Sequence, residues 1–93
     1  MLRFKWDREK AFRNQQKHGV AFDEAATIFG DRLSFTKSDP AHSHPDDDRF
    51  VTIGQSSAGR ILVVAHADDA DTVRIISARL ATRRERIQYE SEP

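Results

Sequence analysis

The spacing of apolar residues changes once along this chain, at Gly30, and that change restricts the fold more than any other feature. Before it, four apolar residues recur at the spacing of one helical face: Phe22, Ala25, Ala26 and Phe29. After it, apolar and polar residues alternate, which is the pattern of a strand. The order predicts helices first and strands afterwards, an α+β fold.

The first thirty residues predict a short strand and two helices. Residues 2–6 alternate as a strand, and Asp7 is a suitable N-cap for a helix that runs to about His18. Gly19 suits the left-handed stop after that helix. Because the helix is polar apart from Ala11 and Phe12, we expect it on the surface. The second helix follows and ends at Gly30.

The rest of the chain predicts four strands and a final helix. We expect strands over residues 33–36, 49–55, 60–67 and 72–78, a loop over 38–48, a hairpin turn at 56–59 and a polar turn at 68–71. Thr82 and Glu85 match a capping box that opens a helix to about Tyr89. We therefore predict one domain over residues 1–93, a small, mostly antiparallel sheet with helices packed on one face.

Composition excludes several classes of protein. The chain has 93 residues, 15 basic and 15 acidic side chains, and no cysteine, so a disulfide framework and a thiol nucleophile are excluded. The longest apolar run, residues 61–65, is too short for a membrane span. Because charged residues follow Leu2 at once, we expect no secretory leader. We expect a small cytoplasmic domain.

The neutral total conceals an uneven charge distribution. Residues 1–30 carry a net charge of +2, residues 31–71 of −4 and residues 72–93 of +2. If the two ends meet in space they form a basic surface, whereas alternation on solvated faces is the simpler interpretation.

Three groups of residues occur in the order of a known family: Trp6-Asp7, Lys10, Asn14, Lys17-His18-Gly19-Val20; Arg49-Phe50, Gly54, Gly59-Arg60; and Arg74-Ile75-Ile76-Ser77-Ala78-Arg79, Glu85, Tyr89. The chain resembles, from about residue 4 to 89, the BrnT family of type II toxins, ribonucleases with a RelE-like fold. The resemblance implies a toxin that cleaves RNA and halts translation, without metal or other cofactor. It also implies a ribbon-helix-helix antitoxin, with two toxins bound to an antitoxin dimer.

Metal-free RNA cleavage uses the 2′-OH of the substrate as nucleophile. It needs a base near that oxygen, cations around the phosphorane and an acid for the leaving oxygen. Arginine suits phosphate and histidine suits proton transfer. Glu85 and Tyr89 are further candidates for proton transfer.

The first predicted helix offers one candidate site. Lys10, Asn14 and Lys17 lie at the spacing of one helical face. This face either binds an RNA backbone or is simply exposed to solvent. His18 follows them and is either a catalytic residue or a favourable charge at a helix end.

Six arginines form the second candidate site. We favour Arg49 and Arg79 as catalytic phosphate ligands, although Arg79 could equally anchor the last helix by pairing with Glu85. Glu85 is either a general base or the capping partner of Thr82. Three of the remaining arginines are candidates for RNA binding, Arg74, Arg83 and Arg86, and Arg84 belongs to the same cluster.

The histidines outside these two candidate sites are not expected to be catalytic. His42 and His44 lie in an Asp-rich loop whose spacing does not match zinc sites, so we expect no metal there and less activity from them than from Arg79. His66 ends a buried strand and is interpreted as a hydrogen-bonded core residue. The competing functions are a nucleic-acid-binding module without catalysis and a protein-interaction domain.

Overall fold

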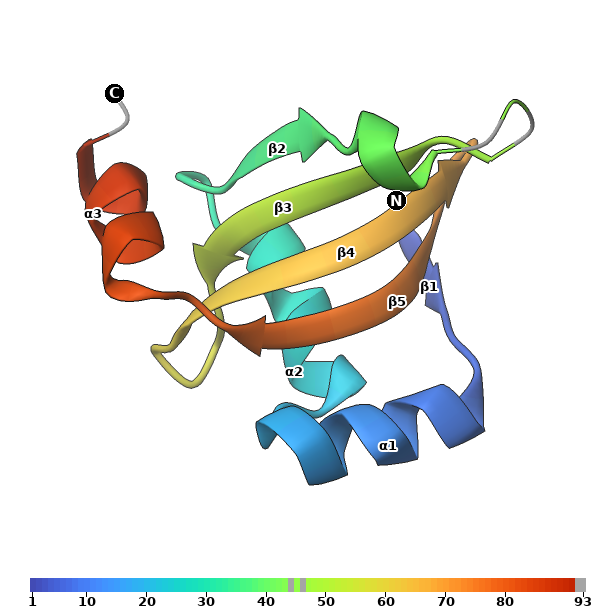
Figure 1. The fold of residues 1–93 in the computed structure, drawn as a ribbon, viewed down its shortest axis with the longest axis horizontal. Coiled ribbons are helices and arrows are strands. Elements are labelled where there is room, and N and C mark those ends of the chain that lie inside the picture. The colour runs from blue at the N-terminus through green and yellow to red at the C-terminus, as the bar shows by residue number, and fades with distance from the viewer. Residues whose placement is uncertain (44, 46, 92–93) are drawn as a thin grey trace.

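The computed structural model describes residues 1–43, 45 and 47–91 as one five-stranded sheet with helices around it (Figure 1). The strands lie in the order β1-β5-β4-β3-β2. Their bounds are β1 Arg3–Lys5, β2 Phe35–Ser38, β3 Arg49–Gln55, β4 Ile61–Asp69 and β5 Thr72–Leu80. The predicted α+β class is confirmed, and β2 to β5 are antiparallel neighbours.

Helix α1, Arg8–His18, begins and ends where the sequence predicts. The Asp7 side chain accepts a hydrogen bond from the backbone N–H of Lys10 at 3.0 Å. Gly19 adopts a left-handed conformation with φ 68°, and its N–H closes the last turn on the carbonyl of Gln15. The predicted second helix is shorter than expected: α2 covers Phe22–Ala26 and continues as a 3-10 turn, η1, over Thr27–Gly30.

Several predicted strand ends differ from the structure by one or two residues, and two of the differences change a loop. The strand expected at residue 33 begins at Phe35, because Leu33 lies in a turn with 63% of its surface exposed. The turn expected over residues 68–71 is only two residues long, since β4 continues to Asp69. Ala70 makes this tight connection with a left-handed φ of 56°.

The parallel strand β1 covers only one end of the edge strand β5. It pairs with residues 72–74, which leaves the following part of the β5 edge without a strand partner in the described residues. The side-chain amide of Asn14 fills part of that gap. It donates to the carbonyl of Ala78 at 2.8 Å and accepts from the N–H of Ala78 at 3.0 Å. Helix α1 is thereby tied to the sheet by a side chain that replaces a backbone partner.

The helices lie on both faces of the sheet, not on one as predicted. The main core packs α2 and η1 against the inner side chains of β4 and β5: Val20, Phe22, Ala25, Ile28, Leu62, Val64, Val73, Ile75 and Ala78. Helix α3, Arg83–Ser91, packs on the other face, where Tyr89 and Ala81 meet Ile53 and Val63. Figure 1 shows α3 apart from α1 and α2. In the described part of the chain, no helix is long and apolar enough to cross a bilayer.

Candidate functional site

Three arginines lie on the sheet face opposite α1 and α2. Ala67 of β4 pairs with Arg49 of β3 on one side and with Arg74 of β5 on the other, and Val63 of β4 pairs with Arg79. Because cross-strand partners and alternate residues of one strand project from the same face, all three arginines share it. We call this surface the arginine face; it also includes Val51, Ile53, Ala65 and Ser77.

An irregularity in β5 brings two of these arginines together. The register with β4 shifts between Ala65 and His66, and Ile76 is the residue left without a partner. Arg74 and Arg79 are five positions apart, so a regular strand would place them on opposite faces. The bulge at Ile76 adds one residue and returns both arginines to the same face.

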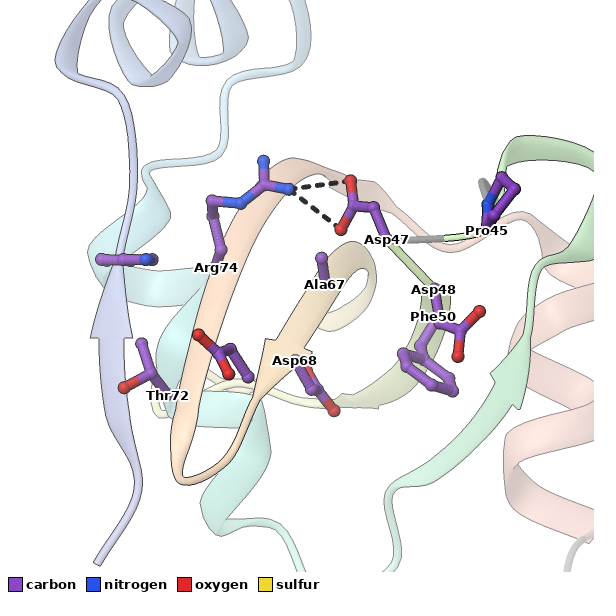
Figure 2. A pocket seen from close by; sticks show the side chains of 10 residues that line it. Pro45, Asp47, Asp48, Phe50, Ala67, Asp68, Thr72 and Arg74 are labelled. Carbon is purple, nitrogen blue, oxygen red and sulfur yellow. Dashed lines mark hydrogen bonds and ion pairs between the residues drawn. The ribbon is translucent and has the colours of Figure 1, made fainter.

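Arg49 and Arg74 are bridged by one carboxylate, that of Asp47. Its Oδ2 accepts from Arg49 Nε at 3.0 Å and from Arg74 Nη2 at 3.1 Å. Figure 2 shows Arg74 reaching from β5 to Asp47 on the far side of Ala67. Partial burial raises the pKa of Asp47, but the hydrogen bond and charge of Arg49, followed by those of Arg74, bring it below its usual value.

Arg79 is held by a different carboxylate, that of Glu85. The pair is bidentate, with Arg79 Nη1 to Oε1 at 2.7 Å and Nη2 to Oε2 at 3.0 Å. Glu85 also accepts from the N–H of Thr82 at 2.8 Å, and its own N–H donates to the Thr82 hydroxyl at 3.2 Å. The predicted capping box is thus confirmed, and Arg79 joins it. The hydrogen bond from Arg79 is the largest cause that lowers the pKa of Glu85 to about 2.

Two adjoining hollows mark the arginine face. One, of about 360 Å³, is lined by Arg79, Glu85 and Gln88 at the α3 end. The second, of about 200 Å³, lies beside Arg49. Both hollows include Ala65 and Ser77, so Arg49 and Arg79 lie at opposite ends of one depression.

A larger hollow than these two lies at the other end of the sheet and has a different charge. It encloses about 550 Å³ (Figure 2). Four carboxylates and only two cations line it: Asp47, Asp48, Asp68, Asp69, Lys5 and Arg74. The excess of carboxylates repels phosphate from this hollow as it stands, but Arg74 and Asp47, which line it, also belong to the bridged group on the arginine face.

His42 is a functional candidate that the sequence assigned to a solvated loop. It ends the 3-10 turn η2, Pro40–His42, and lines the hollow beside Arg49. Its Nδ1 lies 2.9 Å from a carboxylate oxygen of Asp39. The signal in the sequence is the three-residue spacing of Asp39 and His42, which is too common in loops to have indicated a site. His44 lies outside the described residues.

The residues predicted on the first helix lie on the helical side of the sheet. Lys10 and Lys17 are exposed, and His18 is half-buried at the end of α1. Asn14 does not extend this cationic row, because it is 7% exposed and bonded to Ala78 and to the carbonyl of Val20. These residues and the arginine face therefore do not form one site.

Tyr89 lies under α3, not in the depression. It is 7% exposed and its hydroxyl donates to Asp31 Oδ2 at 2.5 Å. Burial, together with the Asp31 carboxylate, raises the pKa of Tyr89 to about 12. A phenol in this state donates its proton poorly at neutral pH.

The remaining candidates have simpler roles. His66 is buried, with Nε2 2.7 Å from the Thr52 hydroxyl and Nδ1 2.6 Å from Asp68. It is thus a hydrogen-bonded core residue, as the sequence indicates. Arg83, Arg84 and Arg86 are exposed on α3. Within the described residues, no group of three carboxylate or imidazole side chains is arranged to hold a metal ion.

Comparison with known proteins identifies the family and relates the fold to a solved structure. A family model described as the ribonuclease toxin BrnT of type II toxin-antitoxin systems matches residues 6–85. The crystal structure of the Brucella abortus ribonuclease toxin BrnT is similar in fold, with a TM-score of 0.63 and 23% identity over 89% of this chain and 100% of that one. No curated protein sequence matches. Because the family model covers most of the chain, the chain belongs to the BrnT family of ribonuclease toxins.

Proposed function

We propose that this chain cleaves RNA on its arginine face, without metal, through the 2′-OH of the substrate. The observation that carries the proposal is the gathering of Arg49, Arg74 and Arg79 on one face, where Arg49 and Arg79 line adjoining hollows and Arg74 lines the hollow at the end of the sheet. Guanidinium groups match phosphate oxygens in geometry and charge, and three of them span adjacent phosphates of a strand.

The reaction needs little beyond the groups on this face. A base removes the proton of the 2′-OH as its oxygen attacks the adjacent phosphorus, the bond to the 5′-oxygen breaks, and an acid or water protonates that oxygen. The products carry a 2′,3′-cyclic phosphate and a 5′-OH. Arg79 would stabilise the charge that develops on the phosphorane through its Nε–H and the second N–H of Nη2, because Glu85 and the carbonyl of Leu80 hold its other donors and fix the guanidinium before the substrate arrives. Arg49 and Arg74 hold a neighbouring phosphate.

Proton transfer is assigned to His42. Of the histidines that the structure describes, His42 alone lines the arginine face, and the Asp39 carboxylate orients its ring. This departs from the expectation that the loop histidines matter little. Glu85 is less suited, since a carboxylate with a pKa of about 2 is a weak base at neutral pH.

Incubation of the purified chain with single-stranded RNA tests the proposal. We expect fragments with 2′,3′-cyclic phosphate ends, in EDTA as well as in Mg²⁺. Intact RNA in both buffers, with salt-sensitive binding, would favour a binding module instead. Absent or salt-insensitive binding would favour a protein-interaction domain.

Family membership also supports a role in translation and an antitoxin partner. We propose that the toxin halts translation and that a ribbon-helix-helix antitoxin covers the arginine face with an acidic or extended segment. Two toxins on one antitoxin dimer is the expected assembly, by analogy alone. Co-expression with the product of the adjacent gene should yield a complex without ribonuclease activity, and failure to co-elute would contradict it.

A further inference from the structure

One carboxylate occupies the position in which the proposed function needs an RNA phosphate. Arg49 and Arg74 project from β3 and β5 on either side of Ala67. Asp47 lies between them, with both of its oxygens within 3.3 Å of Arg74 Nη2 and one of them 3.0 Å from Arg49 Nε.

A phosphate and this carboxylate would use the same donors. Asp47 occupies Nε and Nη2 of Arg49 and Nη2 of Arg74, so a phosphate cannot bind these donors at the same time. With Asp47 in place, the local charge of the three side chains is +1, and without it the charge is +2. Phosphate binding through these donors therefore requires that Asp47 leave.

The attachment of Asp47 allows such a departure. Within the described part of the chain, Arg49 and Arg74 are the only groups that bind its carboxylate. Glu85 differs, because Thr82 holds it in the capping box in addition to Arg79. Asp47 precedes β3 as a single β-bridge residue, so its carboxylate would leave the arginines by rotation of the side chain, with the backbone in place.

We propose that Asp47 is a built-in competitor of the RNA phosphate at the Arg49–Arg74 pair, a proposal that rests on the proposed function. In the free toxin the carboxylate holds both guanidinium groups together. The RNA phosphate replaces it, and Asp47 weakens binding of substrate without taking part in the reaction.

The neighbouring residue offers a matched control. Asp48 is exposed and has no ion pair among the described residues. Asp47→Asn and Asp48→Asn change the net charge equally, so any difference between them reports the bridge to the arginines and not long-range attraction.

The test measures binding of a 2′-O-methyl RNA, which cannot be cleaved, by fluorescence anisotropy. We expect Asp47→Asn to bind about 3- to 10-fold more tightly than the wild type, and Asp48→Asn to gain less, since an exposed ion pair contributes up to about a factor of five. In cleavage assays KM should fall while kcat stays unchanged. Equal affinity for the two variants, or weaker binding by Asp47→Asn, would overturn the proposal and make Asp47 a positioning residue.

A second readout separates this proposal from the proposed function. Inorganic phosphate should shift the Nε–Hε NMR signals of Arg49 and Arg74 at lower concentration in Asp47→Asn than in Asp48→Asn. That result with no RNA binding by any variant would support the competition and contradict the RNA site. Identical phosphate titrations of the two variants would contradict the competition, independently of whether the variants bind RNA.

Discussion

The two faces of the sheet both carry buried or half-buried polar side chains, but the partners of those side chains differ. On the helical side, Asn14 is bonded to the backbone groups of Ala78 and Val20. On the arginine face, Arg49, Arg74 and Arg79 are bonded to carboxylates.

The difference indicates which polar residues serve the fold and which can serve a ligand. A backbone group of a strand cannot leave, so Asn14 is fixed by the fold. A side-chain carboxylate can be replaced by a phosphate, which presents similar oxygens to the same donors. Substitution of a polar residue bonded to the backbone should lower the stability of the protein. Substitution of one bonded to a carboxylate on the arginine face should lower its activity.

The largest effect is expected from Arg79. Arg79→Ala should lower the rate of RNA cleavage by about 100- to 1000-fold, since it removes preorganised charge stabilisation. Circular dichroism should show a folded protein. Arg13→Ala is the matched control, because Arg13 has the same charge but pairs with Glu9 on α1. A folded Arg79→Ala protein with wild-type activity would remove Arg79 from the site.

His42→Ala should lower kcat by about 100-fold if this imidazole transfers the proton. Asp39→Asn should have a smaller effect, because the ring remains but is less well oriented. Both variants should retain the wild-type melting temperature, since His42 is exposed. Unchanged kcat for His42→Ala would show that His42 is a solvated loop residue without a catalytic role, as the sequence predicts.

Asn14→Ala tests the helical face. It should lower the free energy of unfolding by about 3 kcal/mol, because the Ala78 and Val20 backbone groups lose buried partners. Urea unfolding measures this change. The folded fraction should cleave RNA at the wild-type rate, and a loss of RNA binding at unchanged stability would instead support the role first predicted for Asn14.

The smallest effect concerns pH and Glu85. Since folding lowers the pKa of Glu85 from 4.5 to about 2, its ion pair stabilises the protein above pH 4.5 and loses this effect as the pH falls toward 2. Glu85→Gln should therefore cost about 1 kcal/mol at pH 7, and almost nothing near pH 2. A difference independent of pH would show that the pair with Arg79 does not account for it.

The sequence alone predicts the structure correctly where contacts within a few residues, or a simple apolar pattern, determine it. Asp7, Gly19 and the Thr82–Glu85 pair fix helix ends through contacts within a few residues, and their predictions are confirmed. The strands β3, β4 and β5 follow from alternation and from apolar runs.

The sequence alone does not predict features that depend on contacts between residues far apart in the chain. No pattern marks Ile76 as a bulge, so the alignment of Arg74 with Arg79 could not be predicted. Asn14 lies between Lys10 and Lys17 at helical spacing, which suggested a polar face, but its amide completes the edge of a strand 64 residues away. The placement of α3 likewise depends on Tyr89 and its distant partner Asp31.

The central claim is that RNA binds the arginine face and not the helical side. NMR titration with a 2′-O-methyl RNA tests it most directly. We predict that the side-chain signals of Arg49, Arg74 and Arg79 shift most, together with the amides of β3 to β5 around Ala65. Dominant shifts on α1, at Lys10 and Lys17, with the three arginine signals unchanged, would contradict the account.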